Sequence, residues 1–216
     1  MPYAAVCFDL DGVICNSEAV HEAAFQSALH HYGLSLTPRQ YKDYFAGKTD
    51  EQGFVDYAAS LRVVLPVTRL LELKHDAFTY LAPHKLKYYP KLPRIIKNLA
   101  NTVPLALVTG SSAEEAAIAL SQHGLGPYFS VIITAHDTTW GKPDPEGYML
   151  AAKRLGGIRP KDCLAIEDSP SGVLAAQSAG MFCVAVTTTH SAKELAMADA
   201  VESQLTLETL NRLMAY

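Results

Sequence analysis

The stretch Phe8-Asp9-Leu10-Asp11-Gly12-Val13-Ile14 closes the first apolar run of the chain and contains two carboxylates two residues apart. In a β-strand, residues i and i+2 project to the same side, so the strand pattern predicts that Asp9 and Asp11 are neighbours. Two like charges this close repel each other unless a cation or a shared proton intervenes. The stretch is interpreted as a divalent-metal site, as a nucleophile with an acid, or as both. The alternative is an ordinary Asp-Gly turn after a strand.

Six short apolar runs predict the strands around this stretch, and most of them are near-continuous rather than alternating. This pattern is typical of strands that are covered on both faces of a parallel sheet. Helical segments separate the last five runs, which predicts an α/β fold with a doubly wound, Rossmann-like parallel sheet. The predicted strands are residues 3–8, 104–108, 131–134, 163–166, 182–186 and 198–201.

The segment between the first two strands contains helical patterns only. Apolar and aromatic residues recur there at helical spacing, and we assign them to packing. They form four clusters: Phe25, Leu29 and Tyr32; Tyr41, Tyr44 and Phe45; Phe54, Tyr57 and Leu61; and Leu70, Leu73, Ala77 and Tyr80. The pattern predicts an inserted α-helical cap, residues 16–83, in a core formed by residues 1–15 and 84–216. The predicted hinges are residues 15–18 and 83–90.

The bulk composition is that of an ordinary globular protein. The chain has 216 residues, of which 49% are hydrophobic and 19% charged, and its net charge of -4 gives no basic footprint for nucleic acid. Neither a signal-peptide pattern nor an apolar run long enough for a membrane span is expected. The cysteines form no CxxC pair and no zinc spacing, which favours a reducing, cytoplasmic location. They are Cys7, Cys15, Cys163 and Cys183.

Polar residues follow four of the predicted strands. In open parallel sheets, ligands bind beyond the carboxyl ends of the strands, so these groups are expected to converge. They are Asp9 and Asp11; Thr109-Gly110-Ser111-Ser112; Trp140-Gly141-Lys142-Pro143; and Glu167-Asp168-Ser169. Each residue alone could be a helix cap or a solvated loop residue. Their joint order at the strand ends favours a site for an anionic, metal-bound substrate.

The chemistry of these groups suits a phosphate and a divalent metal. Exposed amides after Thr109, at a helix start, can cradle a phosphate. Lys142 can neutralise one of its oxygens. Asp9, Asp11 and Asp168 offer the hard oxygen ligands that Mg²⁺ prefers.

These segments resemble the motifs of the haloacid dehalogenase superfamily, in the branch with a helical cap inserted after the first motif. Residues 8–14 resemble motif one and residues 108–111 resemble motif two. Lys142 in the segment 141–146 resembles motif three, and residues 166–172 resemble motif four. The resemblance covers essentially the whole chain.

The resemblance implies a mechanism of covalent phosphoryl transfer. Asp9 would be the nucleophile and would form an aspartyl-phosphate, which divides one displacement into two easier ones. Asp11 would act first as general acid and then as general base. Mg²⁺ would be held by the Asp9 carboxylate, the Asp11 backbone carbonyl and Asp168, with Glu167 behind these ligands.

The same resemblance implies which residues bind the transferring phosphate. Thr109, Gly110, Ser111 and Lys142 would hold its oxygens, and Thr109 and Lys142 count with Asp9 and Asp11 as the catalytic set. The dehalogenases of the superfamily lack an aspartate at the position of Asp11. Its presence here therefore favours phosphoryl transfer over cleavage of a carbon–halogen bond.

Phosphatases and β-phosphoglucomutases of the superfamily share these motifs. His21 falls where such mutases carry a functional histidine, and we include it as a candidate substrate-binding residue; the alternative is a packing histidine. Asp50 stands where the mutase cap has an arginine, and Ser112 stands where the mutase has a second lysine. A mutase must grip two phosphates, so the loss of two cations favours hydrolysis.

The loop Ala46-Gly47-Lys48-Thr49-Asp50 is the predicted specificity element of the cap. Gly47 permits a turn or a close approach. Lys48 could partly replace the missing cations and is a candidate substrate-binding residue. The alternative is a solvated turn between two helices.

The predicted function is Mg²⁺-dependent hydrolysis of a small phosphomonoester, either a sugar phosphate or a phosphoglycolate-like compound. A phosphosugar isomerase resembling β-phosphoglucomutase is the second hypothesis, and a binding module without catalysis is the third. The predicted partner is a small phosphorylated metabolite, with no nucleic acid and no membrane. The chain is expected to be a monomer or a weak homo-oligomer.

Overall fold

The computed structural model describes residues 3–46 and 48–215. The chain divides into two compact units, an α/β unit formed by Met1–Asn16 and Lys87–Tyr216 and a helical unit formed by Ser17–Leu86. The helical unit is therefore an insertion into the α/β unit. The predicted limits of the insertion, residues 16 and 83, differ from these boundaries by one and three residues.

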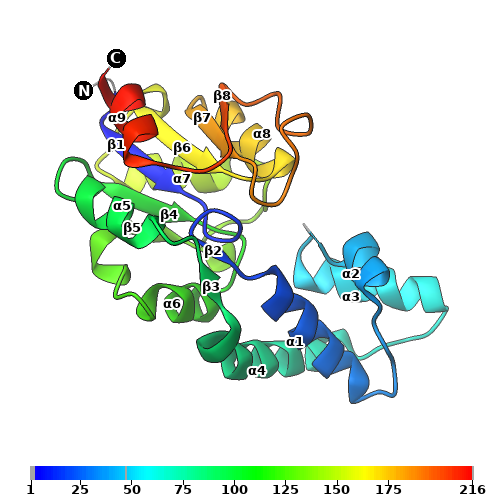
Figure 1. Ribbon diagram of the computed structural model, residues 1–216. Coiled ribbons are helices and arrows are strands. Elements are labelled where there is room, and N and C mark those ends of the chain that lie inside the picture. The colour runs from blue at the N-terminus through cyan, green and yellow to red at the C-terminus, as the bar shows by residue number, and fades with distance from the viewer. Residues whose placement is uncertain (1–2, 47, 216) are drawn as a thin grey trace. The chain divides into compact units, whose positions relative to one another are not determined.

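The α/β unit is built on a parallel sheet (Figure 1). Within the described residues, six strands pair in the order β5-β4-β1-β6-β7-β8. Their bounds are Ala5–Phe8 (β1), Leu105–Val108 (β4), Val131–Ile133 (β5), Cys163–Glu167 (β6), Phe182–Val186 (β7) and Ala200–Glu202 (β8). The predicted parallel α/β sheet is confirmed. Because β1 lies between β4 and β6, the strand order reverses at β1, which is where such sheets bind ligands.

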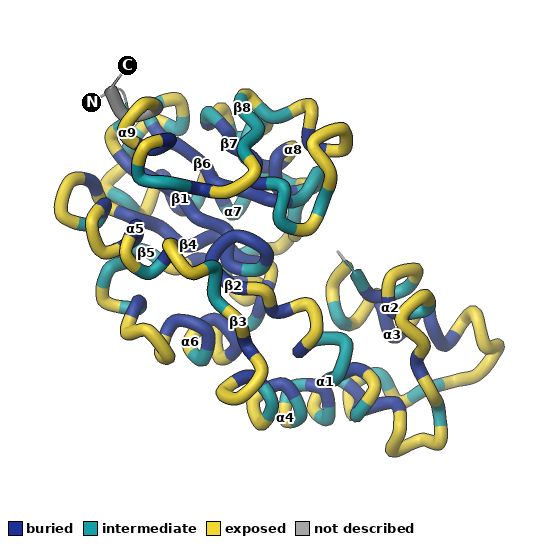
Figure 2. Tube along the Cα trace, in the orientation of Figure 1, coloured by how far each residue is buried: buried dark blue, intermediate teal, exposed yellow. Residues whose placement is uncertain are grey.

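Helices cover this sheet, and its central strands β1, β4 and β6 are buried along their length, whereas the edge strands β5 and β8 are partly exposed (Figure 2). The helices of the unit are Leu92–Leu99 (α5), Ala113–Ser121 (α6), Glu146–Arg154 (α7), Pro170–Ser178 (α8) and Leu207–Ala215 (α9), with 3₁₀ turns at Gly126–Tyr128, Ala135–Asp137 and Pro160–Asp162. Ala5 and Cys7 of β1 share a core with residues of α7 and α8. Val6 and Phe8 alternate with them and therefore face the other side of the sheet.

The helical unit packs around aromatic side chains. Its helices are Glu18–His30 (α1), Pro38–Tyr44 (α2), Asp50–Leu61 (α3) and Val67–Lys85 (α4). Its core contains Phe25, Tyr41, Phe45, Phe54 and Tyr57. The packing assignment was wrong for three other residues, since Tyr32, Leu61 and Tyr80 are 41%, 37% and 75% exposed. Tyr32 lies beyond the end of α1 and Leu61 is the last residue of α3, so helical spacing no longer governs their burial.

Two short strands mark the connections between the units. Cys15–Asn16 (β2) pairs antiparallel with Lys87–Tyr88 (β3). Each strand has only two residues, so neither had a recognisable sequence pattern. The predicted second hinge begins too early, because α4 continues through Pro83 to Lys85. Proline near the end of a helix removes one N–H but leaves the last turn intact, and Leu86 N still donates to Ala82 O at 3.0 Å.

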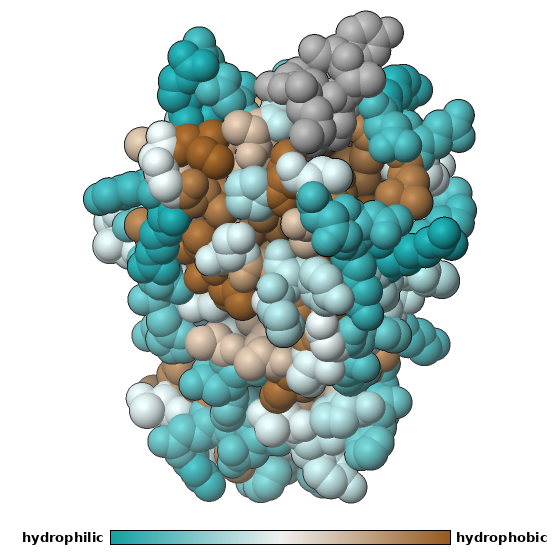
Figure 3. Space-filling view, turned by 90° about the vertical axis from the view of Figure 1, so that its left-hand side faces the viewer, coloured by the Kyte–Doolittle hydropathy of each residue, from teal (hydrophilic) through white to brown (hydrophobic). Residues whose placement is uncertain are grey.

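The surface carries scattered apolar side chains. On the face shown in Figure 3, hydrophobic areas alternate with hydrophilic ones. The edge strand β5 contributes Ile132, which is 36% exposed. In the described part of the chain, none of the helices combines the length and the apolar character that a bilayer crossing requires.

Candidate active site

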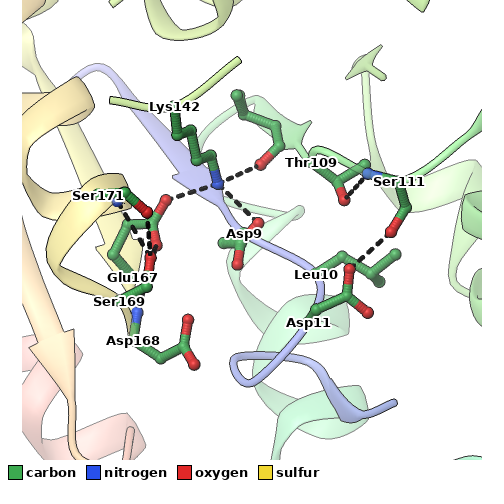
Figure 4. A network of polar contacts seen from close by, with 12 residues as sticks. Asp9, Leu10, Asp11, Thr109, Ser111, Lys142, Glu167, Asp168, Ser169 and Ser171 are labelled. Atoms are coloured by element: carbon green, nitrogen blue, oxygen red, sulfur yellow. Dashed lines mark hydrogen bonds and ion pairs between the residues drawn. The ribbon is translucent and has the colours of Figure 1, made fainter. Parts of the chain in front are cut away.

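The two aspartates that follow β1 have different partners. Asp9 is 7% exposed, and its N–H donates to Ile166 O at 3.0 Å, so it continues the pairing of β1 with β6. The chain then turns back, and Gly12 N donates to Cys15 O at 2.7 Å. In this turn, the carboxylate of Asp11 accepts a 2.7 Å hydrogen bond from Ser111 Oγ (Figure 4). Asp9 thus extends the line of β1, and the turn that follows, rather than strand alternation, places Asp11.

Lys142 lies at the centre of the buried charges (Figure 4). Its Nζ is 2.7 Å from Asp9 Oδ1, 2.6 Å from Glu167 Oε1 and 3.0 Å from Val108 O. The side chain is only 16% exposed. Burial alone would lower the pKa of Lys142, but the carboxylates of Asp9 and Glu167 together raise it, so the lysine is charged.

The segment after β4 joins the site through hydroxyls and amides. Thr109 is buried, and its Oγ accepts a 3.0 Å hydrogen bond from Ser111 N. Ser112 caps α6: its Oγ accepts from Glu115 N, and Glu115 in turn accepts from Ser112 N. Gly110 is exposed, and a Cβ there would meet nothing within 4 Å. The predicted phosphate-binding residues of this segment therefore lie at the start of α6, where the backbone at Gly110 is exposed.

Glu167 ends β6 and is fully buried. Its Oε1 accepts a 2.5 Å hydrogen bond from Tyr148 OH as well as the contact from Lys142, and its Oε2 accepts from Asp168 N at 3.3 Å. A Cβ on Gly172 would lie 1.9 Å from Glu167 Oε2, so only glycine leaves room for this carboxylate. Both oxygens of Glu167 are thus engaged by protein groups.

Asp9, Glu167 and Asp168 form an acidic cluster that suits a metal ion. One carboxylate oxygen from each residue lies within 4.8 Å of the others, and all three side chains are buried. A Cβ on Gly12 would lie 1.8 Å from Asp168 Oδ2, so glycine is also required beside this carboxylate. Three buried hard oxygen donors are the ligand type of Mg²⁺. The residues present therefore fit a divalent cation.

Burial and mutual repulsion perturb these carboxyls. Burial raises the pKa of Asp9 well above its usual value, and Glu167 and Asp168 add to this, while Lys142 opposes it. Burial, followed by the charge of Glu167, raises the pKa of Asp168 to about 7. A bound cation reverses both effects, because it favours the ionised carboxylates.

Sequence reasoning missed several residues around this cluster. Tyr148, which is fully buried, fixes Glu167 from α7. Thr188 and Thr189, in the turn after β7, contact Gly12 and Asp168. β7 was predicted correctly, so the rule that polar residues follow strand ends could have identified the two threonines. Tyr148 sits at an apolar helix position and had no such signal.

The two predicted substrate-binding residues of the cap have partners within the helical unit. The ring of His21 lies 4.6 Å from that of Phe78, and Lys48 Nζ lies 2.6 Å from Asp56 Oδ2. Asp50 pairs with Lys74, whose Nζ is 2.7 Å from Asp50 Oδ2 and whose side chain is 1% exposed. Gly47 lies outside the described residues. A role for His21 or Lys48 in substrate binding stays a prediction.

The sequence of this chain matches a known protein family over most of its length. A family model described as haloacid dehalogenase-like hydrolase matches residues 6–186. The chain belongs to this family. The resemblance in the motifs is therefore confirmed.

Relatives of this haloacid dehalogenase-like hydrolase are named as phosphatases. Validoxylamine A 7'-phosphate phosphatase of Streptomyces hygroscopicus subsp. limoneus is 33% identical over 208 residues, which cover 94% of this chain and 95% of the relative. The fructose-1-phosphate phosphatase of Escherichia coli is 30% identical over 186 residues, covering 85% and 96%. The predicted enzyme class, phosphoric monoester hydrolase, is confirmed.

The fold is shared with a mutase as well. The crystal structure of β-phosphoglucomutase from Clostridium difficile superposes with a TM-score of 0.83 at 23% identity, covering 99% of this chain and 100% of the other. At this identity the likeness establishes the fold of the haloacid dehalogenase-like hydrolase and not its reaction.

Proposed function

We propose that this hydrolase is a Mg²⁺-dependent phosphatase that cleaves a small phosphomonoester through an aspartyl-phosphate on Asp9. The observation that carries the proposal is the separation of the two aspartates. Asp9 belongs to the acidic cluster and is held by Lys142, whereas Asp11 is held by Ser111. Two neighbouring carboxylates with different partners can take the different roles of nucleophile and acid.

In the first step, a carboxylate oxygen of Asp9 attacks phosphorus, and the bond from phosphorus to the leaving oxygen breaks. Asp11 donates its proton to that oxygen. The ammonium of Lys142 favours the ionised form of Asp9, since its charge lowers the pKa that burial raises. The contact at 2.7 Å also fixes the orientation of the nucleophile.

In the second step, Asp11 accepts a proton from water while the water oxygen attacks phosphorus. The bond from phosphorus to Asp9 breaks, and inorganic phosphate and the free Asp9 carboxylate result. Thr109, Ser111 and the amides at the start of α6 are assigned to the phosphate oxygens. Lys142 neutralises part of the charge on the transferring group.

The acidic cluster supports a divalent cation in this site. Asp9 and Asp168 would hold Mg²⁺ together with the backbone carbonyl of Asp11. The bound cation would neutralise negative charge on the phosphate and on the crowded carboxylates. Glu167 has both oxygens engaged by protein groups, so we assign it to holding Lys142 rather than to the metal.

The relatives support a phosphorylated carbohydrate as the substrate. Both relatives described above are named for phosphates of sugar-like compounds. We therefore favour a sugar phosphate over a phosphoglycolate-like compound, and we propose that the helical unit acts as the cap that selects it. Four buried free cysteines support a reducing, cytoplasmic location. A monomer or a weak homo-oligomer stays a prediction.

The nucleophile is tested with Asp9→Asn. This variant should retain its fold by circular dichroism and lose turnover of p-nitrophenyl phosphate. Asp162→Asn is the matched control, because Asp162 pairs only with Arg159 in the described structure, at 2.6 Å, and should keep full activity. Full activity in Asp9→Asn would contradict the proposal.

Hydrolysis is separated from phosphosugar isomerisation by the product. Two observations support hydrolysis: Ser112 serves as a helix cap, and Asp50 is paired with Lys74. Incubation with glucose 1-phosphate and a bisphosphate activator should release inorganic phosphate. Formation of glucose 6-phosphate without net release of phosphate would establish the mutase instead.

A further inference from the structure

The turn that follows β7 brings two threonines to the acidic cluster. It runs from Thr187 to His190 and lies in the orange segment between β7 and β8 (Figure 1). Thr189 is exposed and Thr188 is half-buried, so neither is a core residue. Their hydroxyls nevertheless point to backbone and carboxylate groups of the site rather than to solvent alone.

Thr189 contacts the carboxylate of Asp168. Its Oγ donates a short hydrogen bond to Asp168 Oδ2 and lies 3.3 Å from Asp168 O. His190 Nδ1 lies 3.1 Å from the same carbonyl and 2.9 Å from Thr189 Oγ. A hydroxyl has one proton to donate, and Thr189 donates it to the nearer of the two acceptors, the carboxylate oxygen Oδ2 of Asp168. This bond fixes the rotation of the Asp168 carboxylate about its own axis.

Thr188 contacts the loop that carries Asp11. Its Oγ donates to Gly12 O at 2.5 Å, and the phenol of Tyr89 is a further hydrogen-bond partner of Thr188. Gly12 has a φ of +82°, and a Cβ there would meet Asp168 Oδ2 at 1.8 Å and Thr189 Cγ2 at 3.0 Å. The Gly12 backbone, the Asp168 carboxylate and Thr189 are therefore packed against one another.

We propose that Thr188 and Thr189 are positioning residues of the metal site. Thr189 orients Asp168, and Thr188 holds the Asp11–Gly12 loop beside it, so that the donors are arranged before the cation arrives. This inference rests on the proposed function, which assigns Mg²⁺ to the cluster. Removal of a group that orients a metal ligand lowers metal affinity or activity about 10- to 100-fold.

The decisive variant is Thr189→Val, which preserves the shape of the side chain and removes the donor. Its affinity for Mn²⁺ and Mg²⁺ is measured by isothermal titration calorimetry on metal-free protein without substrate. We expect a dissociation constant roughly 10- to 100-fold larger than that of the wild type. Thr189→Ser restores the hydroxyl and should restore most of the affinity. Thr188→Val should weaken binding in the same direction.

Thr102→Val is the matched control. Thr102 is exposed, lies in the same unit and donates its hydroxyl to Leu99 O at 2.8 Å, far in sequence from the cluster. This variant should bind the metal as the wild type does. Circular dichroism of each variant checks the fold.

The outcomes separate this inference from the proposed function. If the wild type binds metal and Thr189→Val binds it equally well, the positioning role is wrong and the proposed phosphatase stands. If Thr189→Ser is as weak as Thr189→Val, restoring the hydroxyl does not restore the affinity, and the inference is overturned. If the wild type binds neither cation, the metal dependence in the proposed function fails together with the inference. Loss of affinity in Thr189→Val with recovery in Thr189→Ser supports it.

Discussion

Each unit of the molecule holds a lysine that is largely shielded from solvent, and the two lysines, Lys142 and Lys74, are 16% and 1% exposed and are held in different ways. Lys142 of the α/β unit contacts two carboxylates, Asp9 and Glu167, at 2.7 and 2.6 Å. Lys74 of the helical unit pairs with Asp50, and its Nζ lies 5.3 Å from the ring centres of both Phe25 and Phe78. The first lysine lies in a cluster of charges, and the second lies in an aromatic core.

The balance of charge distinguishes the two regions. Burying an ion is costly unless it is paired, and Lys74 with Asp50 makes a balanced pair that the aromatic rings support. In the α/β unit, the three carboxylates of the acidic cluster face one ammonium, which leaves two negative charges in excess when all are ionised. This excess, rather than the burial of a lysine, indicates a site that takes a cation.

The largest difference between the units is expected when each lysine is replaced by methionine. Lys142→Met removes the counter-charge of the nucleophile and a group assigned to the phosphate, so turnover of p-nitrophenyl phosphate should fall at least about 10³-fold. Lys74→Met keeps an apolar stem against the rings and leaves Asp50, which is 37% exposed, partly hydrated. It should cost about 1–2 kcal/mol of stability and leave turnover unchanged.

Steady-state kinetics and thermal unfolding of both variants check this contrast. The two variants separate function from packing, because each removes one ion-paired lysine from a different unit. Equal losses of turnover in the two variants would contradict it. Lys74 would then contribute to turnover as Lys142 does.

The second expected effect concerns pH and metal in the α/β unit. The pKa of Asp168 rises from 3.8 to about 7 on folding, so the metal-free protein is most stable below about pH 4 with respect to this group and loses that contribution as pH rises toward 7. As the pH rises from 4 to 8, the buried carboxyls ionise without a counter-ion, and the Tm of the metal-free protein should fall on the order of 10 °C. Mg²⁺ should restore most of the loss at pH 8.

Differential scanning calorimetry with and without Mg²⁺ measures this linkage. Asp168→Asn is the matched variant, since it cannot ionise at this position and should show a flatter pH dependence with little response to Mg²⁺. A wild-type Tm that is insensitive to Mg²⁺ at pH 8 would contradict the assignment of the acidic cluster to a metal.

Much of the α/β unit and of its candidate site could be predicted from the sequence. Apolar runs ending in Asp9, Thr109 and Glu167 predicted the strand ends, because burial on both faces of a parallel sheet leaves a plain local pattern. The parallel sheet then brought together residues far apart in the chain. Lys142 could be placed by its motif, although no strand pattern precedes it directly.

The remaining features depend on contacts that no local pattern encodes. Tyr148 occupies an apolar position on α7, and only the fold shows that its hydroxyl reaches Glu167. Lys74 was missed for a related reason: a charged residue on an amphipathic helix is expected in solvent, yet Asp50 and two rings bury it. Thr189 contacts a residue 21 positions away, and its partner follows from strand order rather than from spacing.

The third prediction compares two glycines that make room for a neighbour. A Cβ on Gly172 would lie 1.9 Å from Glu167 Oε2, and a Cβ on Gly53 would lie 2.5 Å from the ring of Phe45. Both alanine variants should therefore lose about 1–3 kcal/mol of stability through overpacking. Only Gly172→Ala should also reduce turnover and metal affinity, because it displaces the carboxylate that holds Lys142.

Chemical denaturation and metal titration of the two variants test this difference. If Gly172→Ala retained full turnover, Glu167 would be free to move without consequence, which its four hydrogen-bonding partners argue against. If Gly53→Ala reduced metal affinity, the two units would be coupled through more than the chain that joins them.

The smallest expected effect is a difference in KM between variants of two helix N-caps, each of which forms a capping box. Thr37 caps α2 in the helical unit with Gln40, and Ser112 caps α6 in the α/β unit with Glu115. Thr37→Ala and Ser112→Ala should each cost about 1 kcal/mol, since each leaves one helix N–H without its side-chain acceptor. Only α6 begins at the amides assigned to the phosphate, so only Ser112→Ala should also raise KM for a phosphoester, with little change in kcat. Equal KM values in the two variants would show that the first turn of α6 keeps its phosphate-binding geometry without the cap.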